Sequence, residues 1–367
     1  MNIRSVINAI EDFAPRALQE SYDNAGLQAG DATNICTGVL LTLDVNENTV
    51  TEAKEYGLNC IISHHPLLFK GIKSISPDTP TGRILIDAIS NGITIYSAHT
   101  NLDNARFGVS NRMAQMLGLS GIRTLQPQSA TLVKLAVFVP EAHADKVRDA
   151  MADAGAGAIG DYDRCSYSLE GTGRFRAATG ANPFVGEIGE IHQEAETKIE
   201  VIAPRRLSGR IIRAMLDAHP YEEPAYDIIP LDNADNYSGS GAVGNIKPTT
   251  MGGFIDQLKA TFNCKAIRYC GDERKTITRV ALCGGSGAFM TSDAIASGAD
   301  IYVTGDVKYH DFTSFADKIA IADIGHYESE QCSKSIFREI LEKKFPGLTI
   351  KDAETDINTI KYIQYGN

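Results

Sequence analysis

The chain contains 367 residues, of which 43% are hydrophobic and 22% are charged. This length predicts two or three domains, and the composition is typical of globular proteins. The formal net charge of −11 argues against general attraction to nucleic acid or to an anionic membrane surface. No apolar run is long enough to span a membrane, and the first residues lack a secretory signal, so we expect a cytoplasmic protein without a membrane partner.

Seven cysteines are scattered along the chain, and no two of them form a Cys-x-x-Cys pair. An odd number without close pairs fits neither a disulfide framework nor a zinc knuckle. We therefore expect the cysteines to be reduced thiols.

The two outer parts of the chain share one pattern, in which short β-rich runs alternate with amphipathic stretches. In the first part the runs 38–45, 59–66 and 92–100 each contain a β-rich stretch that is expected to form a strand, and the expected helices are 47–56 and 81–90. The alternation returns in 277–288, 299–310 and 318–330. This pattern predicts βαβ units and a mostly parallel sheet.

The middle of the chain has a different pattern. Strands are expected at 131–139, near 165–175, at 187–203 and at 226–231, with helices at 142–154 and 207–218. The order βαββαβ is that of the ferredoxin-like fold. We therefore predict an α/β protein whose mostly parallel domain is divided by an inserted ferredoxin-like domain. The predicted boundaries are 1–125 for the first half, 126–244 for the insert and 245–367 for the second half.

Four of the eight histidines directly follow expected strands: His64, His65, His99 and His326. Ligands of open α/β sheets bind outside the carboxyl ends of the strands. We therefore expect these histidines to converge on one crevice, although they are far apart in the sequence.

The vicinal pair His64 and His65 is the most specific indication of a metal site among these histidines. Pro66 biases His65 toward an extended conformation, in which neighbouring side chains point to different sides. Such a pair can serve two metal ions better than it can chelate one. The alternative is a pair of structural histidines, and we favour metal ligation because imidazole is the commonest metal ligand.

Two further segments offer carboxylates. Asp103 can supply a carboxylate to a metal, while His99 can be a ligand, an outer partner or a proton carrier. A turn or helix cap is the alternative for this run. If a helix begins at His326, then His326 and Glu330 lie on one face of it, one turn apart. The alternative is an N-terminal capping arrangement in which Glu330 only complements the helix dipole.

Three histidines and two carboxylates exceed the needs of a closed structural zinc site. They suit two divalent ions with a bridging carboxylate and open positions for water. This mixed nitrogen and oxygen set is compatible with zinc, iron, manganese, cobalt or nickel.

Three accessory segments each allow two interpretations. The glycine-rich run 283–288 is either a cradle for an anion or a plain tight turn. Asp306 and His310 lie either in the same crevice as the other histidines or on a surface loop. The run HPYEEP at 219–224 is a rigid connection that can line an interface or a small-ligand groove.

Four runs carry a resemblance to a known family: SHHPLLFKGIKSI, SAHTNLDNARFGVSNRMAQMLGL, GDVKYHD and GHYESE. Together they resemble the GTP cyclohydrolase 1 type 2 homologs, also called Nif-three-like proteins. The resemblance covers about 1–122 and 245–367. The middle section, with its run HPYEEPAYDI, is similar to the PII and CutA-like insert of the longer bacterial members.

The resemblance implies a site for two divalent metal ions, with the ligands His64, His65, Asp103, His326 and Glu330. It also implies a homohexameric toroid whose metal sites face an interior cavity. We therefore expect a metal-dependent hydrolase that acts on a nucleotide-like substrate, with His99 or His310 carrying protons. The alternative is a non-catalytic metal-binding adaptor or regulatory protein with a ligand-sensing PII-like insert. A toroid that threads nucleic acid is disfavoured by the net charge.

Overall fold

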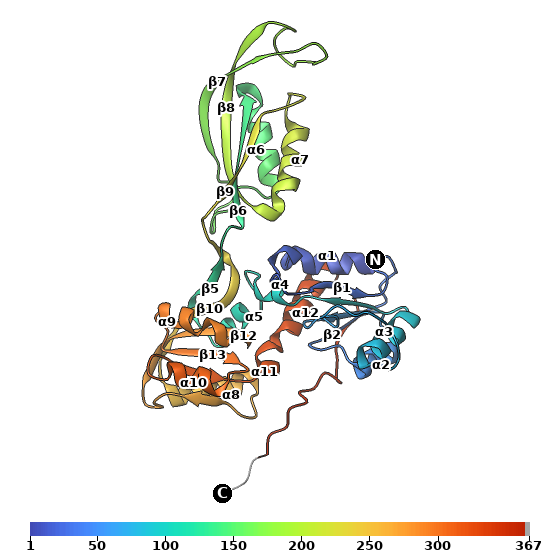
Figure 1. Cartoon of the computed structure of the whole chain (residues 1–367), viewed down its shortest axis with the longest axis vertical. Coiled ribbons are helices and arrows are strands. Elements are labelled where there is room, and N and C mark those ends of the chain that lie inside the picture. The colour runs from blue at the N-terminus through green and yellow to red at the C-terminus, as the bar shows by residue number, and fades with distance from the viewer. Residues whose placement is uncertain (364–367) are drawn as a thin grey trace. The chain divides into compact units, whose positions relative to one another are not determined.

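The computed structural model describes residues 1–363, which divide into two units (Figure 1). Unit 1 comprises Met1–Pro127 together with the chain from Asn236 onward, and unit 2 comprises Gln128–Asp235. The predicted insert, 126–244, contains the whole of unit 2.

The first sheet of unit 1 has five strands in the order β1-β4-β3-β2-β15. Their bounds are β1 Gly26–Ala29, β2 Val39–Thr42, β3 Cys60–Ser63, β4 Thr94–Ser97 and β15 Ile350–Asp352. Strands β4, β3, β2 and β15 run parallel, and β1 pairs antiparallel with β4. Every residue of β2, β3 and β4 is buried, as expected for parallel strands that helices cover on both faces.

Alternate residues of these strands enter different cores. Leu40 and Ile61 pack with residues of α2 (Glu47–Glu55) and α3 (Pro80–Ser90). Leu41 and Ile62 face the larger core, to which α1 (Ile3–Phe13), α5 (Val109–Met116), α8 (Met251–Phe262) and α12 (Cys332–Lys344) contribute. This alternation follows from the two-residue period of a strand.

Both helices expected in this region form with ordinary caps. The side chain of Asn46 accepts hydrogen bonds from the backbone N–H groups of Asn48 and Thr49 at the start of α2. Thr79 caps α3, whose first residue is Pro80. These caps satisfy N–H groups that lack partners inside the helix.

The second sheet of unit 1 has six strands in the order β11-β14-β13-β12-β10-β5. Their bounds are β5 Ser120–Gln128, β10 Asp235–Thr250, β11 Arg268–Cys270, β12 Thr276–Ser286, β13 Ile301–Gly305 and β14 Ala320–Asp323. Strands β12, β13 and β14 are parallel, whereas β10 and β11 pair antiparallel with β12 and β14. Leu282 and Val303 enter the same core as Leu41 and Ile62, so one core joins the two sheets.

Shorter helices complete unit 1. They are the 3-10 turns η1 (Arg16–Leu18) and η4 (Ala288–Met290) and the helices α4 (Thr100–Asp103), α9 (Thr291–Ala296), α10 (Tyr309–Phe315) and α11 (His326–Glu330). Among them, α4 begins just after β4 and α11 begins just after β14. The carboxyl ends of strands in both sheets therefore lead directly into the histidine-bearing segments.

Unit 2 has one antiparallel sheet in the order β7-β8-β6-β9. Its elements follow one another as β6 Leu132–Pro140, η2 Glu141–His143, α6 Ala144–Asp153, β7 Tyr167–Arg176, β8 Ile191–Pro204, η3 Arg205–Leu207, α7 Ser208–Ala218 and β9 Tyr226–Leu231. Val137 and Ile199 pack against Val147 of α6 and Ile211 of α7. Both helices thus cover the same face of the sheet, and the unit has a core of its own.

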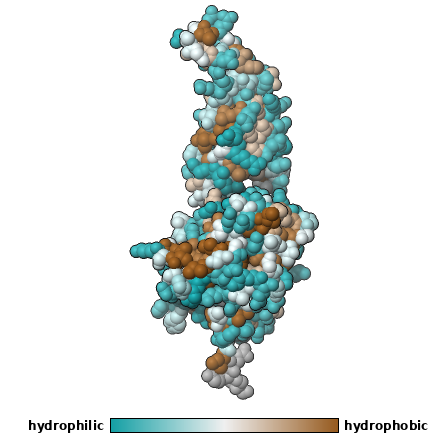
Figure 2. Space-filling model, turned by 90° about the vertical axis from the view of Figure 1, so that its right-hand side faces the viewer, coloured by the Kyte–Doolittle hydropathy of each residue, from teal (hydrophilic) through white to brown (hydrophobic). Residues whose placement is uncertain are grey.

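The surface drawn in Figure 2 is mostly hydrophilic, with separate apolar patches. Among the described residues, no helix combines the length and the apolar character that crossing a bilayer requires. All seven cysteines are free thiols, as predicted.

Phe337 of α12 is fully buried in the core that joins the two sheets. We expect Phe337→Ala to lower the free energy of unfolding by about 3–5 kcal/mol, because it removes apolar contacts and leaves a cavity. Phe337→Leu should lower the free energy of unfolding by clearly less, because leucine fills more of the space. Urea unfolding of the full chain, followed by circular dichroism, checks this, and equal losses for the two variants would contradict it.

Candidate metal centre

His64 follows β3 and is fully buried. Its Nδ1 lies 2.9 Å from the carbonyl oxygen of Ala98, which can only accept a hydrogen bond. Nδ1 therefore carries the proton, and Nε2 presents a lone pair. This Nε2 has no hydrogen-bond partner and lies 3.6 Å from both Asp103 Oδ1 and Glu330 Oε1.

His65 and His326 are held in a similar way. The Nδ1 of His65 lies 2.8 Å from Asp44 Oδ1, and that of His326 lies 2.7 Å from Asp306 Oδ2. A proton on each Nδ1 leaves the Nε2 lone pairs facing inward. There the Nε2 atoms lie 2.8 Å and 3.0 Å from Glu330 Oε2, and 3.2 Å from each other.

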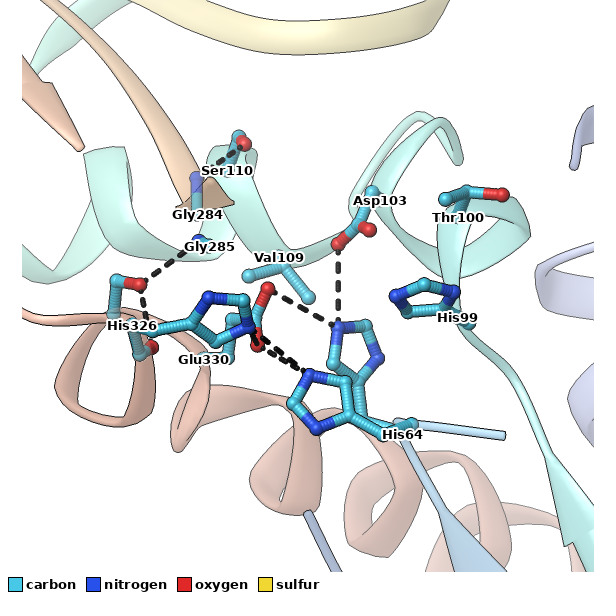
Figure 3. Close-up of polar contacts among 12 residues, drawn as sticks. His64, His99, Thr100, Asp103, Val109, Ser110, Gly284, Gly285, His326 and Glu330 are labelled. Carbon is cyan, nitrogen blue, oxygen red and sulfur yellow. Dashed lines mark hydrogen bonds and ion pairs between the residues drawn. The ribbon is translucent and has the colours of Figure 1, made fainter. Parts of the chain in front are cut away.

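The Glu330 carboxylate lies at the centre of this cluster, and its residue is only 3% exposed (Figure 3). Oε1 faces His64, whereas Oε2 faces His65 and His326. Helix α11 sets this arrangement, because its first and last residues, His326 and Glu330, lie one turn apart as predicted.

The glycine-rich run 283–288 packs against this carboxylate. Gly285 has φ +62°, and a Cβ on it would lie 2.1 Å from Glu330 Oε1, so only glycine fits this position. The N–H group of Gly284 donates to the hydroxyl of Ser110 (Figure 3), and that of Gly285 donates to the hydroxyl of Ser329. Because these amides already have partners, the structure favours the tight turn over the anion cradle.

The donor set fits a metal ion. Two nitrogen lone pairs 3.2 Å apart repel each other unless a positive charge lies between them. Ligand atoms about 2.1 Å from one tetrahedrally coordinated ion lie about 3.4 Å apart, close to the 3.6 Å between His64 Nε2 and Asp103 Oδ1. One candidate ligand atom each from His64, His65 and Glu330 lies within 4.8 Å of the others, so this cluster can hold a metal ion.

The electrostatics also favour a cation. Burial alone lowers the pKa of His65, but hydrogen bonds to Asp44 and Glu330 outweigh it and raise that pKa to about 10. Burial likewise opposes the charge of His326, yet Glu330 and Asp306 raise its pKa to about 9. A cluster with these properties attracts positive charge, which either protons or a metal ion can supply.

His99 lies beside the cluster. Its ring centroid is 5.4 Å from that of His64 and 5.6 Å from that of His65. The Nδ1 of His99 lies 2.8 Å from Asp23 Oδ1, and Asp23 Oδ2 accepts hydrogen bonds from the N–H and hydroxyl of Thr100. Asp23 thus fixes the orientation of the His99 ring.

The structure places the remaining two predicted residues, Asp306 and His310, differently with respect to the cluster. Asp306 contacts the cluster through His326, whereas His310 is exposed on α10 and its ring packs against Tyr309 at 5.3 Å. Sequence reasoning did not identify Asp23 and Asp44. Asp44 could have been found, because it follows an expected strand as the histidines do, but nothing in the sequence around Asp23 marks its role.

The fold and the site together define a divided α/β protein with a buried histidine–carboxylate cluster that can hold a metal ion. The model of the family Duf34/NIF3 (NGG1p interacting factor 3) matches residues 1–360. The chain belongs to this family, which confirms the family predicted from the motifs.

Curated relatives and solved structures support the same family membership. A protein of Halalkalibacterium halodurans is 39% identical over 98% of this chain and 96% of its own length, and one of Bacillus subtilis is 37% identical over 99% of both. Both are named GTP cyclohydrolase 1 type 2 homolog. The crystal structure of a Bacillus cereus protein related to NIF3 is 36% identical, covers 99% of both chains and has a TM-score of 0.87. Staphylococcus aureus protein SA1388 covers 99% of both chains at 27% identity and a TM-score of 0.78.

Asp44→Ala should weaken the binding of Zn²⁺ or Mn²⁺ by about 10–100-fold, because the His65 ring loses the partner that orients it. The exposed surface pair of Asp87 with Lys54 offers the control Asp87→Ala, which should leave the affinity unchanged. Calorimetric titration of the chelator-treated full chain measures both. Unchanged affinity in Asp44→Ala would argue against His65 as a ligand.

The Asp23 carboxylate should stabilise unit 1 in a pH-dependent way. Burial opposes its charge, but the hydrogen bonds from His99 and Thr100 outweigh burial and lower the pKa of Asp23 to about 2. Because the pKa is lower in the folded state, the ionised carboxylate stabilises the fold at any pH above its pKa in the unfolded chain. This stabilisation is lost as the pH falls toward 2. We expect Asp23→Asn to cost about 2 kcal/mol at pH 7 and almost nothing at pH 2. Urea unfolding over this range tests it, with the exposed Asp12→Asn as control.

Proposed function

We propose that this chain is a metal-dependent hydrolase that acts on a nucleotide-like or related heterocyclic substrate. Two divalent ions would be held by His64, His65, Asp103, His326 and Glu330. The observation that carries this proposal is the division of the ligands between the two oxygens of Glu330, at 2.8–3.6 Å. The names of the curated relatives support the same reading.

The ions would supply Lewis-acid activation of water and of the substrate at neutral pH. The chain's own contribution is to orient the ligand rings. Asp44, Asp306 and the Ala98 carbonyl each hold one Nδ1, which fixes the tautomer that a metal ligand needs.

His99 is better placed than His310 to carry a proton. Asp23 holds its Nδ1, so the Nε2 edge is left to accept or donate a proton next to the ligand rings. His310 has its ring contact with Tyr309 instead. We therefore assign the proton transfer to His99.

Two exposed rings extend from the cluster and suit a planar substrate. Phe69 is 46% exposed and lies 6.1 Å from the His99 ring, and Tyr22 is 63% exposed and lies 6.5 Å from Phe69. Exposed aromatic rings beside a polar site favour ligands that stack. This row supports a heterocyclic base in the substrate.

We also propose that unit 2 is a ferredoxin-like module of the PII and CutA type. The sheet order β7-β8-β6-β9 and the sequence of its elements support this assignment. A homohexameric toroid in the cytoplasm is likewise proposed from the family resemblance.

The full-length chain, loaded with Mn²⁺, Fe²⁺ or Zn²⁺ and offered GTP and related nucleotides, tests the activity. Glu330→Ala and His64→Ala should abolish turnover together with metal binding, because they remove ligands. Glu342→Ala, at an exposed position of α12, is the matched control. Turnover that persists in both ligand variants would contradict the proposed site.

In the same assay, His99→Gln should lower kcat by about 10²–10⁴-fold while the metal content stays the same. Phe69→Ala should mainly raise KM, because the ring touches the substrate and not the ions. A change in metal content in His99→Gln would instead make His99 a ligand.

A further inference from the structure

Unit 2 contains a cavity of about 620 Å³, a size typical of small-molecule sites. The floor is formed by Phe138 of β6 and by Glu196 and Lys198 of β8. These residues alternate with Val137 and Ile199, whose side chains pack against α6 and α7. The cavity therefore lies on the face of the sheet that the helices leave uncovered.

Two glycines of β7 open this cavity. Gly171 and Gly173 pair with Glu196 and Glu194 of β8, so a side chain at either position would project from the same face as Glu196. A Cβ on Gly171 meets nothing within 4 Å, whereas one on Gly173 would collide with the Glu196 carboxylate. The strand thus leaves space where other residues would fill it.

Aromatic rings form the walls. Phe175, Phe184 and Tyr221 line the cavity, and the Tyr221 ring lies 6.1 Å from Phe175 and 6.3 Å from Phe184. Phe184 is 52% exposed, although it is a large apolar side chain. Such rings attract cations to their faces.

The charged residues that line the cavity are mostly acidic: Glu170, Glu196, Glu222 and Glu223 against Arg174 and Lys198. Lys198 pairs at 2.7 Å with Glu200, which Lys134 also contacts, and the Lys198 ammonium lies 5.8 Å from the centroid of the Phe138 ring. Glu196 accepts a hydrogen bond from the Tyr221 hydroxyl at 3.0 Å, which holds a carboxylate beside the rings. This balance repels phosphates and carboxylates and favours a positively charged ligand.

We propose that this cavity binds a small organic cation, with an ammonium group between Glu196 and the aromatic rings and an apolar body against Leu169. The site is independent of the metal centre, because all of its residues belong to unit 2. It gives the HPYEEP run, which supplies Tyr221, Glu222 and Glu223, a role in ligand binding.

Benzyltrimethylammonium and choline are suitable probes, with 3,3-dimethylbutan-1-ol as the uncharged counterpart of choline and benzoate as an anion. Binding to the full chain is measured by saturation-transfer NMR and by calorimetry. We expect both cations to bind, and the alcohol and benzoate to bind at least about tenfold more weakly, since only a cation is attracted to the faces of the aromatic rings.

Three variants locate the binding. Glu196→Gln keeps an acceptor for the Tyr221 hydroxyl but removes the negative charge, and it should weaken the binding of both cations by about tenfold. Gly171→Leu should fill the cavity and abolish binding. Phe184→Ala, at an exposed position, should weaken binding without affecting folding. Glu190→Gln, an exposed glutamate just before β8, is the matched control.

Equal affinity for choline and its uncharged counterpart would overturn the proposal. So would unchanged cation binding in both Glu196→Gln and Phe184→Ala. A change of oligomeric state in Gly171→Leu, seen by light scattering without any binding of the cations to the parent chain, would show that a second copy of the chain covers the cavity instead.

Discussion

The arrangement of unit 1 depends on one carboxylate that three imidazoles approach. Glu330 is buried, and its oxygens lie within 3.6 Å of the Nε2 atoms of His64, His65 and His326. Burial alone would keep this carboxyl neutral, but the neighbouring imidazoles hold the pKa of Glu330 well below its usual value. The residues around Glu330 keep the ionised carboxylate in place. Gly285 leaves room for the carboxylate, and outer acceptors turn the ring nitrogens inward.

The fold explains how distant residues reach this carboxylate. His64 and His99 follow parallel strands of the first sheet, and Asp306 and His326 follow parallel strands of the second. One core packs the two sheets together, so that the carboxyl ends of both contribute to one site. A site of this kind requires that both halves of the chain are folded, since neither half supplies all of its residues.

Much of this could be predicted from sequence, because strand ends and helix spacing are local properties. The i, i+4 spacing placed His326 and Glu330 on one helix face, and the expected strands placed the histidines at their ends. The convergence of two sheets on Glu330 is a tertiary property, which a single sequence does not encode in any local pattern. Asp23 escaped notice for that reason, since it lies 76 residues from its partner His99. In unit 2 the sequence marked only the HPYEEP run as able to line a groove, because the rest of the cavity depends on the missing side chain at Gly171 and on loop residues such as Phe184.

The strands that lead into and out of unit 2 are neighbours in the six-stranded sheet. Hydrogen bonds from the hydroxyls of Ser120 and Thr124 of β5 to the backbone of β10 hold them side by side. Adjacent strands lie about 4.8 Å apart, a gap that a two-residue hairpin turn can close. Both ends of the module thus leave unit 1 from one pair of neighbouring strands, and a short turn at this place would join β5 to β10 without involving any residue that surrounds Glu330.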